Sequence, residues 1–285
     1  GGTEVDAQTI TSGAKASEPT APTKTGYTFS GWYKEEAYTT AWDFDVDTVI
    51  ENTTLYAQWT ANDYNITFDK NDAGAAGTMT DQTIACGSSA NLTKNTFTKT
   101  GYTFSGWATT QTGEVAYADE ESYTMGAGNV NLYAKWGYTV IFNSQGGSAV
   151  ASQVVLPDGK VTKPNDPTKS GCEFKGWYKE AECTNAWDFA NDKVTSNIAL
   201  YAKWTINTYT VTFNSQGGSK VGSQTVEYGG KVTKPTNPTK EGYTFGGWYK
   251  ESGCTNAWDF ANDTVTSYIT LYAKWTPLYA LRDTG

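Results

Sequence analysis

The sequence predicts a mostly β protein, α+β at most, arranged as a tandem array of four small repeat domains. The phrase Gly-Tyr-Thr-Phe-x-Gly-Trp occurs at residues 26–32, 101–107 and 242–248, and a variant of it occurs at 171–177. A second phrase, Leu-Tyr-Ala-Lys/Gln-Trp, ends each copy, at Trp59, Trp136, Trp204 and Trp275. Segments of the copies alternate apolar and polar residues, and no stretch has convincing helical periodicity.

The last copy shows the expected elements most clearly. Residues 209–213 alternate apolar and polar side chains, as a half-buried strand does, and Gly217 and Gly218 favour a turn after it. Pro235 and Pro238 predict an extended crossing, because each fixes its own φ and biases the preceding residue away from helix. Five strands are expected in this copy, at residues 209–213, 224–228, 243–249, 257–260 and 269–275.

The phase of the repeats sets the predicted domain boundaries. These are residues 1–60 for repeat 1, 61–136 for the divergent repeat 2, 137–205 for repeat 3, 206–276 for repeat 4, and 277–285 for a tail that resembles the start of a further repeat. Residues 1–5 align with 217–221, so repeat 1 is expected to lack its first strand. We expect a monomer, with strand exchange between the chain ends of two molecules as a hypothesis. The short linkers predict a semi-rigid string about 110 Å long.

Composition excludes several functions. The chain has no His, which removes the commonest general base and the commonest metal ligand. The net charge is −9 and there is a single Arg, which argues against nucleic acid as a partner. No apolar run reaches about 18 residues, so no membrane insertion is expected. We therefore predict a protein that is not an enzyme, with no catalytic, cofactor-binding or metal-binding residues and no cofactor.

The ordered pattern of motifs resembles one known family. From residue 209 to 275 it runs Tyr-Thr-Val-Thr-Phe-Asn, Gly-Gly, Gly-Tyr-Thr-Phe-x-Gly-Trp-Tyr, Ala-Trp-Asp-Phe and Leu-Tyr-Ala-Lys-Trp. This pattern is similar to the Listeria–Bacteroides repeat, or internalin B-repeat, family, and it covers essentially the whole chain. The resemblance implies a β-grasp, ubiquitin-like fold, an extracellular or cell-surface location in a bacterium, and adhesion to a host-surface protein or glycan. Repeat 2 departs from the pattern by lacking Ala-Trp-Asp-Phe.

Two functional interpretations follow. The first is a cell-surface stalk or spacer with an adhesive role in host or matrix attachment. The second is a carbohydrate-binding module that uses exposed Tyr and Trp. Alternate residues of a strand face opposite sides, so Leu271, Ala273 and Trp275 are predicted in the core, as are Trp248 and Trp258. The candidate ligand-binding residues are the tyrosines beside these core positions, namely Tyr249, Tyr272, Tyr178, Tyr201, Tyr33 and Tyr56.

Three weaker signals have alternative interpretations. Cys172 and Cys183 are the one pair that could form a disulfide within a copy, and the alternative is that each is a small apolar substitute for Tyr. The spacing Asp43-x-Asp45-x-Asp47 hints at calcium, but Thr stands where a calcium loop needs Gly and Glu, so a solvated turn is favoured. Residues 281–285 resemble a sortase signal with Arg282 in place of Pro, and the start of another strand is the favoured interpretation.

Overall fold

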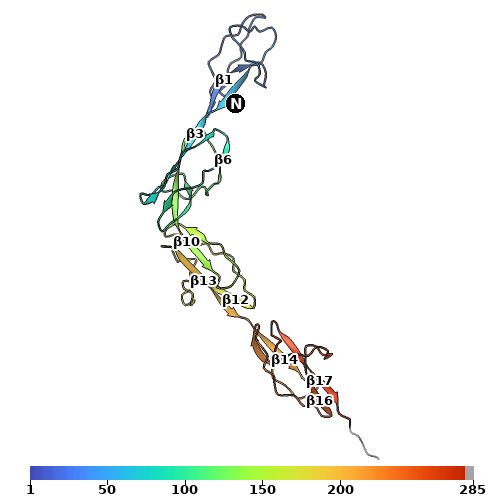
Figure 1. Ribbon diagram of the computed structural model, residues 1–285. Helices are drawn as coiled ribbons and strands as arrows, with labels where there is room; N and C mark the ends of the chain where they lie inside the picture. Colours follow the sequence, from blue (N-terminus) through green and yellow to red (C-terminus); the bar gives the residue numbers. More distant parts are fainter. Residues whose placement is uncertain (280–285) are drawn as a thin grey trace, which may run out of the picture. The chain divides into compact units, whose positions relative to one another are not determined.

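The computed structural model describes residues 1–279, and within them it is all β, with no helix (Figure 1). The mostly β prediction is therefore confirmed. By compactness the chain divides into two units, which we describe separately. Unit 1 comprises Gly1–Thr139 with Val154–Gly159 and Lys193–Asn197, and unit 2 comprises Val140–Gln153, Lys160–Asp192 and the chain from Ile198 onward. Among the described residues, no helix is long and apolar enough to cross a membrane.

Repeat 4, in unit 2, contains the most regular sheet. Its strands are β14 (Thr208–Asn214), β15 (Gln224–Glu227), β16 (Tyr243–Tyr249) and β17 (Ile269–Pro277), in the order β15-β14-β17-β16. The central pair β14 and β17 is parallel, with Val211 opposite Ile269, and both outer pairs are antiparallel. The side chains that fill its core come from all four strands and the connecting segments, and they include Val211, Phe213, Trp248, Val265 and Leu271.

The glycine of the motif Phe-x-Gly-Trp lies in a β-bulge of the strand that carries the motif. The register of β16 against β17 shifts between Phe245 and Trp248, and Gly247 in this bulge has φ +110°. Only glycine adopts such a φ without strain, and the bulge turns the following Trp toward the core. Its counterparts Gly31, Gly106 and Gly176 also have positive φ.

The predicted strand at residues 257–260 is wrong. Only Ala257 forms an isolated bridge, to Tyr249, and Trp258 N–H donates to Trp248 O (2.8 Å). The chain then turns, because the Asp259 carboxylate accepts the N–H of Ala261 and the Asp263 carboxylate accepts the N–H of Asp259, both at 2.8 Å. Asp side chains that bond to backbone two to four residues away compete with strand pairing.

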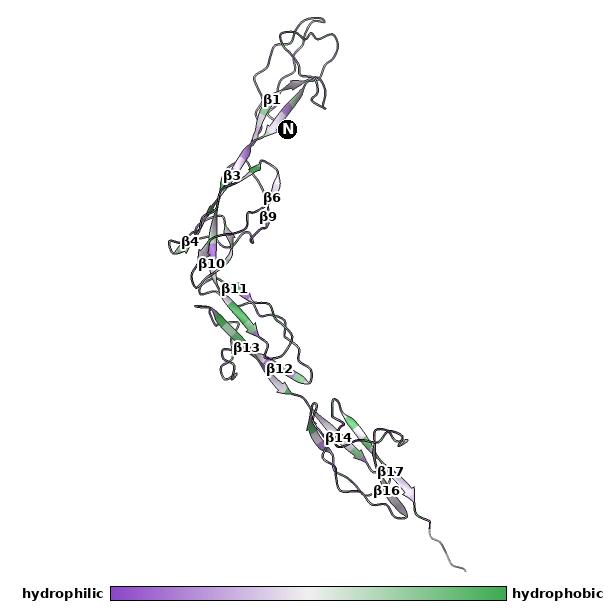
Figure 2. Cartoon of the chain, in the orientation of Figure 1, coloured by the Kyte–Doolittle hydropathy of each residue, from purple (hydrophilic) through white to green (hydrophobic). Residues whose placement is uncertain are grey.

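Most of repeat 3 lies in unit 2. Its strands β12 (Cys172–Tyr178) and β13 (Ile198–Ile206) are antiparallel, and the last residues of β10 (Val130–Asn143) run parallel to the start of β13. Hydrophobic residues are prominent on β13 in Figure 2. The remaining strand of this repeat is β11 (Gln153–Val155).

Repeat 2, in unit 1, has short additional strands. Its core, centred on Trp107, is formed by residues of the repeat itself, and Tyr117 bridges to Trp107 where the other copies use Ala-Trp-Asp-Phe. Besides the first part of β10, its strands are β3 (Asp63–Asp69), β4 (Ala75–Ala76), β5 (Gln82–Ala85), β6 (Ser89–Asn91), β7 (Thr98–Lys99), β8 (Thr103–Ala108) and β9 (Ser122–Thr124).

Repeat 1, also in unit 1, contains two named strands, β1 (Tyr27–Tyr33) and β2 (Tyr56–Ala61), which pair only with each other. At the other end of the chain, the Leu278 N–H donates to Gly242 O (2.8 Å) and Tyr279 is exposed. Of the predicted tail 277–285, residues 280–285 lie outside the described residues, as does the stretch 281–285 that resembles a sortase signal.

Candidate functional site

The six candidate tyrosines form three cross-strand pairs. Tyr33 lies opposite Tyr56, Tyr178 opposite Tyr201, and Tyr249 opposite Tyr272, each at the end of an antiparallel ladder. All six side chains are half-buried. Each pair follows the bulge and faces away from the Trp of the core, because the neighbours of Tyr272, Leu271 and Ala273, are buried. The same two-ring surface therefore recurs in repeats 1, 3 and 4.

A lysine completes this surface in repeats 3 and 4. Lys203 Nζ lies 4.9 Å from the ring centroid of Tyr178, and Lys274 Nζ lies 5.0 Å from that of Tyr249. An ammonium within about 6 Å of a ring face is attracted by the ring quadrupole, so these lysines hold the tyrosine rings in place. In repeat 1 Gln58 stands at this position, and Tyr38 packs edge-on against Tyr33 with ring centroids 5.6 Å apart.

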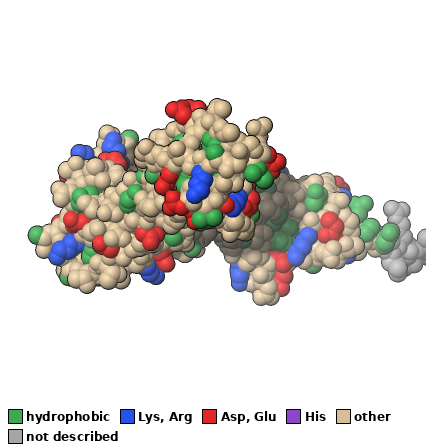
Figure 3. Space-filling model, turned by 90° about the horizontal axis from the view of Figure 1, so that it is seen from above, with side chains coloured by type: hydrophobic (Ala, Val, Ile, Leu, Met, Phe, Trp, Pro, Cys, Tyr) green, Lys and Arg blue, Asp and Glu red, His purple; other side chains and the backbone are tan. Residues whose placement is uncertain are grey.

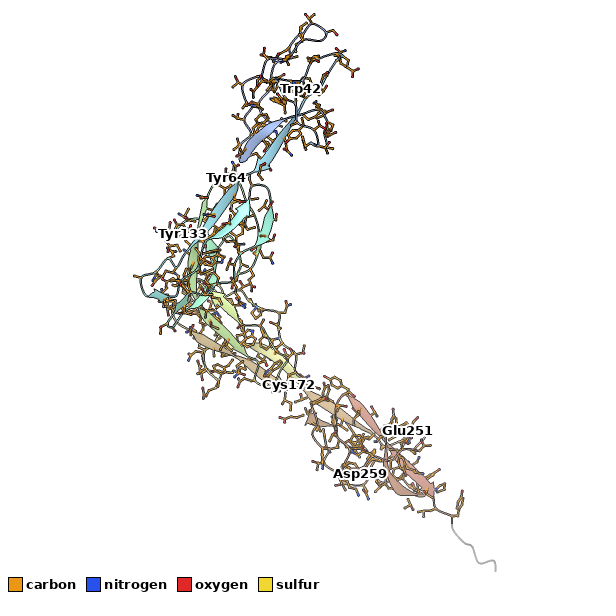
Figure 4. The ribbon with its side chains drawn as sticks, turned by 45° about the horizontal axis from the view of Figure 1, so that its top comes forward. Trp42, Tyr64, Tyr133, Cys172, Glu251 and Asp259 are labelled. Carbon is orange, nitrogen blue, oxygen red and sulfur yellow. The ribbon has the colours of Figure 1, made fainter. Side chains whose placement is uncertain are left out.

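Repeat 2 lacks the tyrosine pair. Its β10 residue Tyr133 lies opposite Ala108, so only one ring remains at the equivalent place (Figure 4). The Ala108 side chain is fully buried and cannot replace a tyrosine on the outer surface. Repeat 2 therefore provides a natural control for any role of the tyrosine pair.

The tryptophans belong mainly to the core. Trp248 is 2% exposed and packs edge-on against Phe213 and Phe245, with ring centroids 4.9 and 5.5 Å away. Trp258 and Trp275 are half-buried against the same core, and Trp275 Nε1 donates to Ser215 O (2.7 Å). Core packing, rather than ligand contact, accounts for the positions of these three residues.

The disulfide alternative for Cys172 and Cys183 is wrong, since all four cysteines are free thiols. Cys172 lies on β12 (Figure 4), whereas Cys183 is buried at a loop position with φ +53°. Gln145 Nε2 contacts Cys183 Sγ (3.2 Å) and donates to Ala202 O (2.9 Å), so one side chain ties this loop to β13. No sequence pattern indicates this glutamine contact, which Gln216 repeats with Cys254 in repeat 4.

The acidic turns are held by lysine. Lys250 Nζ lies 2.8 Å from Asp263 Oδ1 and 5.5 Å from the ring centroid of Trp258. In repeat 1 Lys34 makes the same contacts with Asp47 and Trp42, so one of the three carboxylates whose spacing hinted at calcium is paired with an ammonium. Within residues 1–279 there is no group of three or more His, Cys, Asp or Glu side chains arranged to hold a metal.

An adjacent loop depends on an ionised glutamate. Glu251 Oε1 accepts the N–H groups of Thr255 and Asn256 (both 2.7 Å) and the Thr255 hydroxyl, and Figure 4 places Glu251 and Asp259 in this repeat. Led by the bond from the Thr255 side chain, these interactions lower the pKa of Glu251 to about 2. The same pattern lowers the pKa of Glu35 in repeat 1.

Acid is therefore expected to destabilise repeat 4. The folded-state pKa of Glu251 lies below its ordinary value of 4.5, so the stabilisation is complete above about pH 4.5 and is lost as the pH falls toward about 2. Glu251→Gln should lower the melting temperature near pH 7 and reduce its further drop in acid, measured by thermal unfolding at both pH values. The matched control is Glu241→Gln, at an exposed position outside this loop. Equal acid sensitivity of the Glu251→Gln variant and the parent chain would contradict the assignment.

These features define a tandem-repeat protein whose modules are built from β-strands and three of which carry the tyrosine pair. The model of the Listeria-Bacteroides repeat domain matches residues 1–58, 64–135, 138–203 and 209–274. The chain belongs to this family, as the sequence motifs predicted.

Curated relatives agree with this assignment. The chain is 43% identical, over 88% of its length, to a predicted Gly-rich membrane protein of Evansella cellulosilytica, and 34% identical, over 91% of its length, to a predicted membrane protein of the same bacterium. It is 41% identical, over 49% of its length, to internalin H of Listeria monocytogenes. The chain spans only 31%, 28% and 25% of these three proteins, respectively.

Proposed function

We propose that the chain is a cell-surface repeat region, located in the bacterial cell envelope or outside the cell, that serves as a non-enzymatic stalk with an adhesive role in host or matrix attachment. The observation that carries the proposal is the recurrence of one β repeat four times in tandem. Membership of a repeat family that is shared with internalin H, and relatives named as membrane proteins, support the location.

The surface of the modules supports a stalk. On the face shown in Figure 3, Lys side chains and Asp or Glu side chains are interspersed, and hydrophobic side chains occur in scattered groups. Such a surface stays solvated. Repeats 2 and 4 each bury a core of their own residues, so these two modules do not need a neighbour's side chains to fill their interiors.

We also propose that each complete repeat is a helix-free variant of the β-grasp fold. The mixed sheet of repeat 4 supports this, because its two central strands are parallel and each is flanked by an antiparallel partner. Parallel neighbours require a crossover connection. Here part of that connection is a stretch without strand or helix, residues 228–242, in which Pro235 and Pro238 disfavour helix.

The adhesive role is assigned to the paired tyrosines. A tyrosine offers an apolar ring face for stacking and a hydroxyl for hydrogen bonding, which suits both protein and sugar surfaces. Three copies of one weak site on a single chain also act together, because the second contact forms at a high effective concentration. A carbohydrate-binding module that uses these tyrosines is the alternative, because Lys203 and Lys274 beside the rings of repeats 3 and 4 add hydrogen-bond donors that suit sugar hydroxyls.

The test is binding of the intact chain to an array of glycans and extracellular-matrix proteins. We expect selective binding that falls at least about tenfold when the six paired tyrosines become Ala, since three sites are lost together. Tyr133→Ala, which removes the unpaired ring of repeat 2, should leave binding unchanged. Circular dichroism of each variant checks that the fold survives.

The outcomes separate the candidates. Binding confined to glycans would favour the carbohydrate-binding module, and binding to matrix proteins would favour the adhesive stalk. A folded chain that binds nothing above background would overturn the adhesive role. If the Tyr133→Ala variant lost as much binding as the variant without the six paired tyrosines, the tyrosine pairs would not be the binding site.

A further inference from the structure

Two links between repeats, one in each unit, are built in the same way. Residues 60–63 connect repeats 1 and 2, and residues 205–208 connect repeats 3 and 4. We call these links joint 1–2 and joint 3–4. At both joints the first glycine of the motif Gly-x-x-Phe-x-Gly-Trp meets a residue of the next repeat. Each joint is therefore a packed contact between neighbouring repeats.

At joint 3–4 a tyrosine ring covers the glycine. The Asn207 N–H donates to Gly171 O, and the Tyr228 N–H donates to Asn207 O, both at 2.8 Å. A Cβ atom at Gly171 would overlap the Tyr228 ring, so this ring lies directly on the glycine. The Tyr228 hydroxyl also lies 3.0 Å from Ser170 Oγ, within hydrogen-bond distance. The Tyr228 side chain therefore connects repeat 4 to repeat 3 through both its ring and its hydroxyl.

At joint 1–2 the same backbone bonds surround a cysteine. The Asn62 N–H donates to Gly26 O (2.9 Å), and the Cys86 N–H donates to Asn62 O (2.8 Å). A Cβ atom at Gly26 would overlap Cys86 Sγ. The ring at this joint comes from repeat 1, because the Tyr27 hydroxyl donates to Cys86 O (3.4 Å). A Cβ at Gly87 would lie 2.9 Å from the Tyr27 hydroxyl oxygen, so Tyr27 occupies the space at this turn of repeat 2.

The two joints exchange a large and a small residue. Cys172 (Figure 4) stands directly after the motif glycine, where joint 1–2 has Tyr27. Cys86 stands at the turn of the next repeat, where joint 3–4 has Tyr228. Each joint therefore contains one tyrosine and one cysteine, and the tyrosine comes from opposite sides at the two joints. Such an exchange keeps the total volume of a packed contact, because empty space and overpacking both cost stability.

We propose that each joint is an interface whose two sides are matched in size. One position, 27 or 172, follows the motif glycine, and the other, 86 or 228, meets that glycine from the next repeat. A repeat with tyrosine at the first position fits a following repeat with a small residue at the second, and the reverse combination fits equally well. This matching selects which repeat can follow which, and it couples the two repeats at each joint. The interface does not include the six paired tyrosines and does not depend on their adhesive role.

A double-mutant cycle in the intact chain tests the match at joint 3–4. Cys172→Tyr places two rings in one space, and Tyr228→Cys leaves the space empty. Each substitution alone should speed hydrogen exchange of the Asn207 amide, which bonds across the joint, at least about tenfold. The double variant reproduces joint 1–2 and should return this exchange rate to within about threefold of the parent chain, because the two changes compensate. A thiol reductant is present throughout, so that no disulfide forms.

Two controls separate opening of the joint from other effects. Exchange of the amides of β13 and β14 reports unfolding of repeats 3 and 4, and it should stay as slow as in the parent chain. Tyr243→Cys is the matched substitution, because Tyr243 is the counterpart of Cys172 in repeat 4. Tyr243 lies opposite Pro277, at the end of β17 that is distant from joint 3–4, so this variant should leave the Asn207 exchange rate unchanged.

The mirrored cycle at joint 1–2 provides an independent test. Tyr27→Cys and Cys86→Tyr should each speed exchange of the Asn62 amide, and the double variant, which reproduces joint 3–4, should restore it. Rescue at both joints is the expected result. Single variants that exchange like the parent chain, or double variants in which the two effects simply add at either joint, would overturn the proposal.

Discussion

Trp248→Ala is expected to destabilise repeat 4 strongly while leaving repeats 1 and 2 unaffected. Trp248 is 2% exposed and packs on Phe213 and Phe245. Loss of a buried Trp costs about 3–5 kcal/mol, because the transfer free energy is lost and a cavity remains. A domain of about 70 residues has a total stability of roughly 4–10 kcal/mol, so a large part of it is removed.

Denaturant unfolding combined with amide hydrogen exchange measures this effect. Protection should fall first across residues 208–277 and persist in the core of repeat 2 around Trp107. Trp32→Ala is the matched control, because Trp32 is only half-buried, so its loss should cost clearly less. Loss of protection in all four repeats at once would show that the modules are not independent.

Gly218→Ala is expected to displace Trp275 from its position beside the turn after β14. A Cβ atom at Gly218 would lie 2.4 Å from Trp275 Cζ2 and 3.1 Å from the backbone oxygen of Thr239. The indole cannot move without weakening the bond from Trp275 Nε1 to Ser215 O. Overpacking of this kind costs about 1–3 kcal/mol.

The matched control for this substitution lies four residues further on. A Cβ at Gly222 would meet nothing within 4 Å, so Gly222→Ala should be neutral or slightly stabilising through the lower entropy of the unfolded chain. The two variants are compared by their melting temperatures and by the Trp fluorescence of the folded state. Equal stability of the two variants would show that the turn absorbs the extra methyl group.

The sequence predicted the parts of this fold that depend on local pattern. Alternation placed Leu271 and Ala273 inside and Tyr272 outside, and β14, β15, β16 and β17 were found close to their predicted positions. The prediction failed at residues 257–260, where Trp and Phe suggested a strand but Asp259 and Asp263 bind the backbone and form a turn. Local side-chain bonds to the backbone overcame the apolar pattern there.

The candidate site was only partly accessible from the sequence. The tyrosines could be placed on the outer face of their strands, because a strand has a period of two residues. The pairing of these tyrosines could not be predicted, because Tyr249 and Tyr272 lie on different strands. The bulge at Gly247 sets which residues of the two strands are opposite each other. The contact of Gln216 with the Cys254 loop was missed for the same reason.

The sequence by itself determined the number of repeats, the β class, the family and the residues of the core, since all of these follow from motifs and periodicity along one copy. Only the tertiary structure decided that β14 runs parallel to β17 between two antiparallel partners and that the tyrosines meet as cross-strand pairs. Periodicity shows which face of a strand is buried, but it does not show which strand lies beside it. Pairing brings together segments that are distant along the chain, and only packing in three dimensions selects among the possible partners.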